Sequence, residues 1–153
     1  MTNKIPQEII YKYPKILLSG GTGQVGWELQ RMLQPLGEVW SPSRKYFNLA
    51  ESESLRQKIR DYQPDLIVNA AAYTEVDQVE LNPELAYSIN VESPRILAEE
   101  AYNLEIPLIH YSTDYVFDGR KSEPYTENSK TNPINVYGKT KLEGETAIQE
   151  SHN

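Results

Sequence analysis

Two features of the sequence predict an α/β fold in which helices cover both faces of a parallel sheet. Short apolar runs, such as those at 15–19 and 66–69, alternate with longer amphipathic stretches. This alternation is typical of strand–helix–strand units, whose strands lie parallel. The first apolar run is also followed at once by a turn rich in glycine, as at the start of a doubly wound sheet. We therefore expect a doubly wound domain over residues 15–153, preceded by a polar leader over residues 1–14.

Each strand is predicted where a short apolar run stops at a turn residue. The predicted strands cover 15–19, 38–41, 46–49, 66–69 and 107–112, of which the third is very short. Apolar residues at helical spacing predict a helix from Gln24 to about Pro35. Asn48, followed three residues later by Glu51, has the form of a capping box, so the next helix is expected to begin behind Asn48 and to end at Pro64.

A long helical stretch is predicted over residues 83–103, and a last helix from near Asn135 to the C-terminus. Pro94 lies inside the first stretch and has no N–H group, so the carbonyl of Asn90 loses its partner within the helix. The proline either kinks the helix and leaves that carbonyl free for water, or marks the point where two shorter helices meet, with Ser93 as N-cap.

The composition argues against several classes of protein. No apolar run is long enough to span a bilayer, and the first residues lack the apolar core of a signal peptide. There is no cysteine, and the two histidines, His110 and His152, are far apart in sequence, so neither disulfides nor a metal site is expected. A net charge of -7 argues against nucleic acid as the partner. Together these features favour a cytoplasmic setting.

The glycine turn reads GGTGQVG over residues 20–26, with Gly20, Gly23 and Gly26 three residues apart. In a dinucleotide-binding turn the first glycine turns the chain, the second lets a pyrophosphate approach the backbone, and the third lets the helix pack on the strand. The helix N-terminus then presents free N–H groups to the phosphates. A glycine pattern alone is as often an ordinary turn, but here a strand precedes it and an amphipathic helix follows. The turn therefore favours a Rossmann-type fold that binds NADPH or NADH.

The segment after the second strand bears on the choice of cofactor. An acidic residue there would hold the ribose hydroxyls of NAD, but residues 41–44 read SPSR. The hydroxyl of Ser43 and the guanidinium of Arg44 match the oxygens of a 2′-phosphate. This favours NADPH over NADH, the alternative being an arginine in an exposed loop.

Two further strand ends are expected to face the cofactor, because ligands bind at the carboxyl ends of parallel strands. The three alanines at 70–72 are small enough for a flat ring or a ribose to lie on the backbone, although tight packing of a core strand favours alanine equally. Thr113 and Asp114 follow the next strand, where a hydroxyl can hydrogen-bond a substrate carbonyl. A turn or a helix cap is the ordinary interpretation of such a Ser-Thr-Asp run.

The last predicted helix opens with YGKTK, in which Tyr137 and Lys141 are four residues apart and share one face. An ammonium about 6 Å from the phenol would stabilise the phenolate by roughly 2 pK units. We therefore expect Lys141 to lower the pKa of Tyr137 towards physiological pH, where a phenol can act as general acid or base. Alone, this spacing is common on solvated helices, but after the glycine turn and Thr113, in that order, it favours a catalytic group.

Five segments carry a resemblance to a known family, namely GGTGQVGWELQ, DLIVNAAAYTEVDQVE, INVESPRILAEEA, IHYSTDYVFDG and NVYGKTKLEGE. Together they resemble the extended branch of the short-chain dehydrogenase/reductase superfamily, and within it the dTDP-4-dehydrorhamnose reductase family. The resemblance extends from Lys15 to about Gln149.

The resemblance implies a role for each candidate residue. Thr113, Tyr137 and Lys141 would be the catalytic residues, of which the tyrosine gives the proton and the threonine polarises the ketone. The residues implied to bind the cofactor are Gly20, Gly23, Gln24, Val25, Gly26, Ser43, Arg44, Asn48, Leu49, Ala71, Ala72, Tyr73, Thr74, Tyr111, Tyr137 and Lys141. The residues implied to face the sugar are Val76, Thr113, Asp114 and Tyr115.

The resemblance also implies a function, the NAD(P)H-dependent reduction of dTDP-4-dehydro-L-rhamnose to dTDP-L-rhamnose, by an enzyme that is a homodimer in its full-length form. Members of the family continue beyond the helix of the catalytic tyrosine into a C-terminal domain that binds the sugar. We therefore expect this chain to lack the substrate domain and to be inactive alone. The alternatives are another nucleotide-sugar reductase or epimerase of the same branch, or a non-catalytic NAD(P)-binding regulatory subunit.

Overall fold

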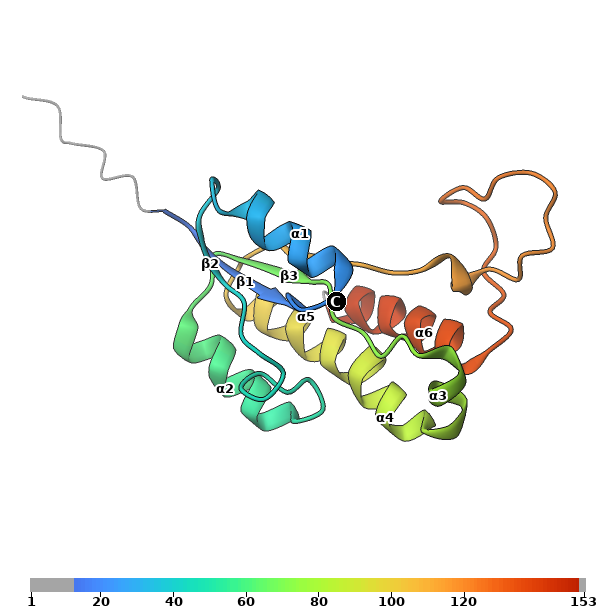
Figure 1. The fold of residues 1–153 in the computed structure, drawn as a ribbon, viewed down its shortest axis with the longest axis horizontal. Helices are drawn as coiled ribbons and strands as arrows, with labels where there is room; N and C mark the ends of the chain where they lie inside the picture. Colours follow the sequence, from blue (N-terminus) through green and yellow to red (C-terminus); the bar gives the residue numbers. More distant parts are fainter. Residues whose placement is uncertain (1–12, 152–153) are drawn as a thin grey trace, which may run out of the picture.

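The computed structural model describes residues 13–151, in which one parallel sheet of four strands is covered by helices on both faces (Figure 1). The strands are β1 (Lys15–Ser19), β2 (Glu38–Trp40), β3 (Leu66–Asn69) and β4 (Leu108–His110). They pair in the order β2-β1-β3-β4, so the chain moves first to one side of β1 and then to the other. The predicted doubly wound fold is confirmed. The leader expected over residues 1–14 lies outside the described residues except for its last two.

The helices lie on opposite faces of the sheet. They are α1 (Gln24–Leu33), α2 (Ser52–Tyr62), α3 (Val76–Leu81), α4 (Pro83–Tyr87), the π-helical η1 (Ser88–Glu92), α5 (Ser93–Asn103), the 3-10 helix η2 (Asp114–Val116) and α6 (Val136–Glu150). In Figure 1, α1 covers one face, while α2 and α5 cover the other. Strand side chains alternate accordingly, since Ile16 and Leu18 pack with α1 and Leu17 packs on the opposite face. Within residues 13–151, no helix combines the length and the hydrophobicity that a membrane span requires.

One predicted strand is replaced by turns, and one α-helix was not predicted. Residues 46–49 form turns in place of a short strand, because Phe47 and Leu49 are buried in the core without pairing to the sheet. Helix α3 follows β3 in a segment where the sequence analysis expects no element. Its Val79 is fully buried beside Tyr137, so tertiary packing holds this short helix in place.

The predicted start of α2 is also wrong. The helix begins at Ser52, four residues after the expected cap Asn48. The two side chains of the expected capping box do meet, since the Asn48 amide donates to the Glu51 carboxylate at 2.8 Å. The Asn48 side-chain oxygen, however, accepts the backbone N–H of Ala50 at 3.2 Å. Such a local turn competes with a helix start.

The helical stretch predicted over residues 83–103 is confirmed as one continuous path through α4, η1 and α5. A π turn over Ser88–Glu92 widens the hydrogen-bond ladder just before Pro94, whose nitrogen cannot donate. Ser93 keeps helical backbone angles, and its hydroxyl donates to the carbonyl of Leu49 at 2.6 Å. Ser93 is therefore not an N-cap between two separate helices.

The π turn brings Asn90 against α6. Its carbonyl, which one of the two alternatives leaves free for water, faces Gly144, where a Cβ would lie only 2.1 Å from the oxygen. The Asn90 side chain accepts the N–H of Tyr73 at 2.8 Å and donates to the Tyr73 carbonyl at 3.1 Å. The same amide donates to the hydroxyl of Thr140 at 3.1 Å. One buried side chain therefore connects the segment after β3, the π turn and α6.

Candidate active site

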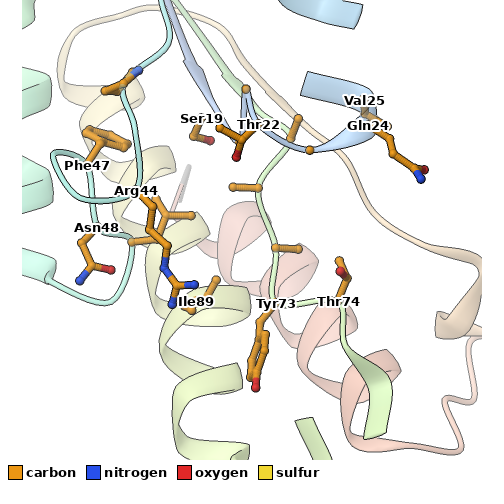
Figure 2. Close-up of a pocket in the computed structure, with 18 residues that line it drawn as sticks. Ser19, Thr22, Gln24, Val25, Arg44, Phe47, Asn48, Tyr73, Thr74 and Ile89 are labelled. Atoms are coloured by element: carbon orange, nitrogen blue, oxygen red, sulfur yellow. The ribbon is translucent and has the colours of Figure 1, made fainter. Parts of the chain in front are cut away.

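A pocket of about 640 Å³ opens at the carboxyl ends of β1 and β3 (Figure 2). Its walls are the glycine turn, the first turn of α1, the loop after β2 and the segment after β3. The expected cofactor-binding residues that line it are Gly20, Gly23, Gln24, Val25, Arg44, Asn48, Leu49, Ala71, Ala72, Tyr73 and Thr74. Lining residues that the sequence analysis missed are Ser19, Gly21, Thr22, Pro42, Phe47 and Ile89.

The three spaced glycines of the turn meet different constraints. Gly20 has a φ of +81°, and a Cβ there would lie 2.7 Å from the backbone nitrogen of Ala71. A Cβ on Gly26 would lie 2.1 Å from the Gly20 carbonyl. Both glycines are therefore required for the chain to pack on itself. Gly23 has room for a Cβ, with its nearest neighbour at 3.4 Å, and it lines the pocket at the N-terminus of α1. Its lack of a side chain keeps space open in front of the free N–H groups of the helix.

The residues expected to face the sugar gather around Tyr137 at the start of α6. The Thr113 hydroxyl lies beside the phenol of Tyr137 and accepts the N–H of Tyr115 at 3.3 Å, which caps η2. The rings of Tyr115 and Tyr137 pack edge to face with centroids 5.4 Å apart. The Thr113 hydroxyl also donates to Asp114 at 3.3 Å, and Val76 packs against the same cluster. The structure therefore brings together all four residues of this set.

This cluster is continuous with the pocket but does not line it. Tyr73 is shared, since it lines the pocket and packs against the cluster that contains Tyr137. Tyr137 and Lys141 themselves are not among the lining residues. Ser43 also lies outside the pocket wall, and its carbonyl accepts two N–H groups of the turn that follows. Tyr111 reaches the site through its carbonyl, which accepts a hydrogen bond from Lys141 at 2.7 Å.

Burial governs the protonation of the Tyr–Lys pair. Lys141 is 1% exposed, and this burial lowers its pKa to about 8 against the opposing effect of Glu145. Burial raises the pKa of Tyr137, while the neighbouring hydroxyl of Thr113 lowers it in part. The expectation that Lys141 lowers the pKa of Tyr137 is therefore wrong for this structure, in which the lysine nitrogen bonds the Tyr111 carbonyl. A protonated phenol is the form that a proton donor needs.

The sequence analysis did not assign to the site four polar residues that are buried or half-buried there. They are Ser19, Asn69, His110 and Asn90. The first three end β1, β3 and β4, so a polar residue closing an apolar strand was the signal that could have found them. Among the residues that the structure describes, no group of three or more histidine or acidic side chains is arranged to hold a metal ion.

The sheet order, the glycine turn, and Thr113 after β4 next to Tyr137 and Lys141 on α6 define a Rossmann-type domain of the short-chain dehydrogenase/reductase class. The sequence pattern of the RmlD substrate binding domain family matches residues 14–153, and the chain belongs to this family.

Relatives and solved structures agree with this assignment. The chain is 49% identical over 139 residues to a dTDP-4-dehydrorhamnose reductase of Escherichia coli, covering 88% of this chain and 46% of that enzyme. The reductase of Bacillus anthracis in complex with NADP superimposes with a TM-score of 0.87 at 34% identity, covering 92% of this chain and 51% of that one. The orthologue from Clostridium acetobutylicum gives 0.85 at 39% identity, covering 89% and 49%. The chain thus spans about half the length of the curated relatives it matches.

The burial of Lys141 predicts an unusual pH dependence of stability. Its folded-state pKa of about 8 lies below the ordinary 10.5, so between these values the unfolded chain binds a proton that the folded protein lacks. Relative to Lys141→Met, the free energy of unfolding should therefore rise by about 2 kcal/mol between about pH 8 and pH 10. Urea unfolding of both proteins at several pH values measures this difference. Parallel profiles would contradict a pKa lowered by burial.

Proposed function

We propose that this protein is an NAD(P)H-dependent reductase of dTDP-4-dehydro-L-rhamnose, to which this chain contributes the dinucleotide pocket and the proton donor. The observation that carries the proposal is the cluster that brings Thr113 and Tyr115 to the phenol of Tyr137, next to a pocket that begins at a glycine turn. The names of the relatives support the substrate, and the NADP complex of the Bacillus anthracis enzyme supports the cofactor. A homodimer and a cytoplasmic setting stay predictions.

The residues that line the pocket suit an extended dinucleotide. Gly23, Gln24 and Val25 would hold the pyrophosphate at the N-terminus of α1, where the helix dipole and free N–H groups favour an anion. Asn48 and Leu49 would contact the adenine. The segment over residues 72–74 would lie along the ribose and the nicotinamide. When bound, NAD(P)H supplies the hydride that reduces the ketone.

The residues around Tyr137 complete the reduction. A ketone carbon that accepts a hydride leaves its oxygen with a negative charge, which requires one proton to give the alcohol. Tyr137 donates that proton, because burial keeps its phenol protonated. The hydroxyl of Thr113, which lies beside the Tyr137 side chain, can donate to the same oxygen and polarise the ketone beforehand. Lys141 lies one helical turn away and is the nearest base on α6 that can exchange a proton near neutral pH.

Arg44 supports NADPH as the preferred form of the cofactor. It is the one cationic side chain among the residues that line the pocket. In the view of Figure 2, its guanidinium lies between Asn48 and Tyr73. A guanidinium binds phosphate oxygens through paired N–H groups, which suits the 2′-phosphate that distinguishes NADPH from NADH.

The first prediction from the proposed function concerns the glycine turn. Gly23→Val should abolish NADPH binding with little loss of stability, because the backbone has room for a side chain there and only a bound pyrophosphate would collide with it. Gly26→Val is the matched contrast, since its side chain would meet the Gly20 carbonyl and destabilise the fold itself. Calorimetric titration with NADPH and thermal unfolding separate the two effects. Wild-type affinity in Gly23→Val would remove the pyrophosphate from this turn.

The second prediction concerns the cofactor preference. Arg44→Ala should weaken NADPH binding by about 1.5–3 kcal/mol more than NADH binding, as expected for a hydrogen-bonded charge pair. Arg31→Ala serves as the control, because Arg31 is an exposed arginine of α1 that pairs with Glu28. Titration of each variant with both cofactors gives the comparison. Equal losses for NADPH and NADH would show that Arg44 does not contact the 2′-phosphate.

The third prediction concerns Tyr137. Tyr137→Phe should lower kcat by about 10²–10⁴-fold and keep NADPH affinity, because it removes only the donated proton. Tyr125→Phe is the control, since that hydroxyl bonds Asp118 away from the cluster. Activity is measured as NADPH oxidation with dTDP-4-dehydro-L-rhamnose, using a chimera in which residues 14–153 replace the matching part of the Escherichia coli relative.

Two outcomes of this assay would contradict the proposal. Near-normal kcat in Tyr137→Phe would remove the phenol from the reaction. A folded chimera that binds NADPH but does not turn over would instead favour the non-catalytic NAD(P)-binding subunit.

A further inference from the structure

A line of polar side chains crosses the carboxyl edge of the sheet and ends at Lys141. The side-chain oxygen of Asn69 accepts the backbone N–H of Ala71 at 3.1 Å and the hydroxyl of Ser19 at 2.6 Å. The Asn69 amide nitrogen lies 3.0 Å from Nδ1 of His110. The other ring nitrogen, Nε2, lies 3.2 Å from Nζ of Lys141. Asn69 is 0% exposed and Lys141 1%, so both partners of the half-buried His110 ring are shielded from water.

The backbone fixes the direction of these hydrogen bonds. The N–H of Ala71 can only donate, so the oxygen of the Asn69 amide must face it. A flipped amide would set two N–H donors against each other. The nitrogen of Asn69 therefore faces His110, and because it can only donate, Nδ1 of the ring must accept.

The ring of His110 is then confined to one tautomer. Burial, together with the charge of Lys141, lowers the pKa of His110 to about 4, so the ring is neutral at physiological pH. A neutral imidazole carries one N–H. Because Nδ1 accepts from Asn69, the proton sits on Nε2 and points at Nζ of Lys141.

An N–H that faces Nζ favours one state of the lysine. A neutral amine can accept this hydrogen bond through its lone pair, whereas an ammonium has only donors. The carbonyl of Tyr111 accepts an N–H of Lys141 in either state. Two acidic groups are also nearby, since Glu145, one turn further along α6, favours the ammonium, and Asp114 of η2 acts on Tyr137.

We propose that His110, oriented by Asn69 and the Ala71 backbone, is a positioning residue that donates from Nε2 to Lys141 and thereby lowers the proton affinity of this amine. The inference rests on the proposed function in one respect, namely that Lys141 acts together with Tyr137 in proton transfer. An amine that titrates near neutral pH can give and take protons during turnover, whereas an ordinary lysine keeps its proton. Asn69 and His110 at the edge of the sheet thus influence the protonation of Lys141 on α6.

The tautomer is tested directly by NMR. The chain has two histidines, so His152→Asn leaves the ring of His110 as the single signal. Two-bond ¹H–¹⁵N correlation spectra at about pH 7 should show the Nε2–H tautomer. Asn69→Asp replaces the donor to the ring with an acceptor and should move the proton to Nδ1. Ser19→Ala is the matched control and should leave the tautomer unchanged, because the Ala71 N–H still fixes the amide. A wild-type ring protonated on Nδ1 would overturn the proposal.

The effect on Lys141 is tested by titration of its Cε signal in protein labelled with ¹³C-lysine, assigned by its loss in Lys141→Met. His110→Phe keeps the ring and removes the N–H, so the titration midpoint of Lys141 should rise by about one pH unit, a tenfold gain in proton affinity. An unchanged midpoint in the folded variant would overturn the proposal. If His110→Phe does not fold, the tautomer that NMR shows for His110 in the wild-type protein decides whether the proposal holds. Neither measurement uses NADPH or substrate, so a failure of the proposed function is detected separately by the binding and turnover assays.

Discussion

The side chain of Asn90 holds together the two parts of the site. It bonds both backbone groups of Tyr73, which lines the pocket, and the hydroxyl of Thr140, which lies on the helix of Tyr137. Because the amide is 1% exposed, loss of any of these partners would leave a polar group buried without a hydrogen bond. Asn90 therefore ties the pocket wall at Tyr73 to the helix that carries Tyr137, and the π turn around Asn90 places its side chain between them.

Close backbone approach reinforces this arrangement. Gly144 lets α6 lie against the carbonyl of Asn90, and Gly138 lets the start of the same helix lie against Tyr115, where a Cβ would come within 2.2 Å of the carbonyl. Because neither glycine has a side chain, α6 packs closely on neighbouring backbone at two points, one on each side of Lys141. The deep burial of Lys141 follows, and with it the lowered pKa. The packing of α6 therefore affects the pKa values of Tyr137 and Lys141 more than their four-residue spacing does.

The local parts of this structure could be predicted from the sequence, and the parts that depend on distant contacts could not. The bounds of β1 and β3, the helix after the glycine turn and the start of the last helix near Asn135 follow from short patterns, and all are confirmed. Residues 46–49 have the apolar content of a strand, but they form turns, and Phe47 and Leu49 pack into the core without pairing to the sheet. The raised pKa of Tyr137 depends on burial by α3 and η2, which no spacing within one helix reveals.

The register of the sheet explains why the polar line across its edge forms at all. Ser19 pairs with Asn69 and Asn69 with His110, so the last residues of β1, β3 and β4 stand side by side in one row. Neighbouring parallel strands lie about 4.8 Å apart, which lets short polar side chains in one row bond directly. A single polar residue at the end of a strand indicates only a turn. Three in register form a row that runs from the wall of the pocket at Ser19 to the lysine on α6. A shift in register by one residue would turn side chains of the row to the opposite face and break it.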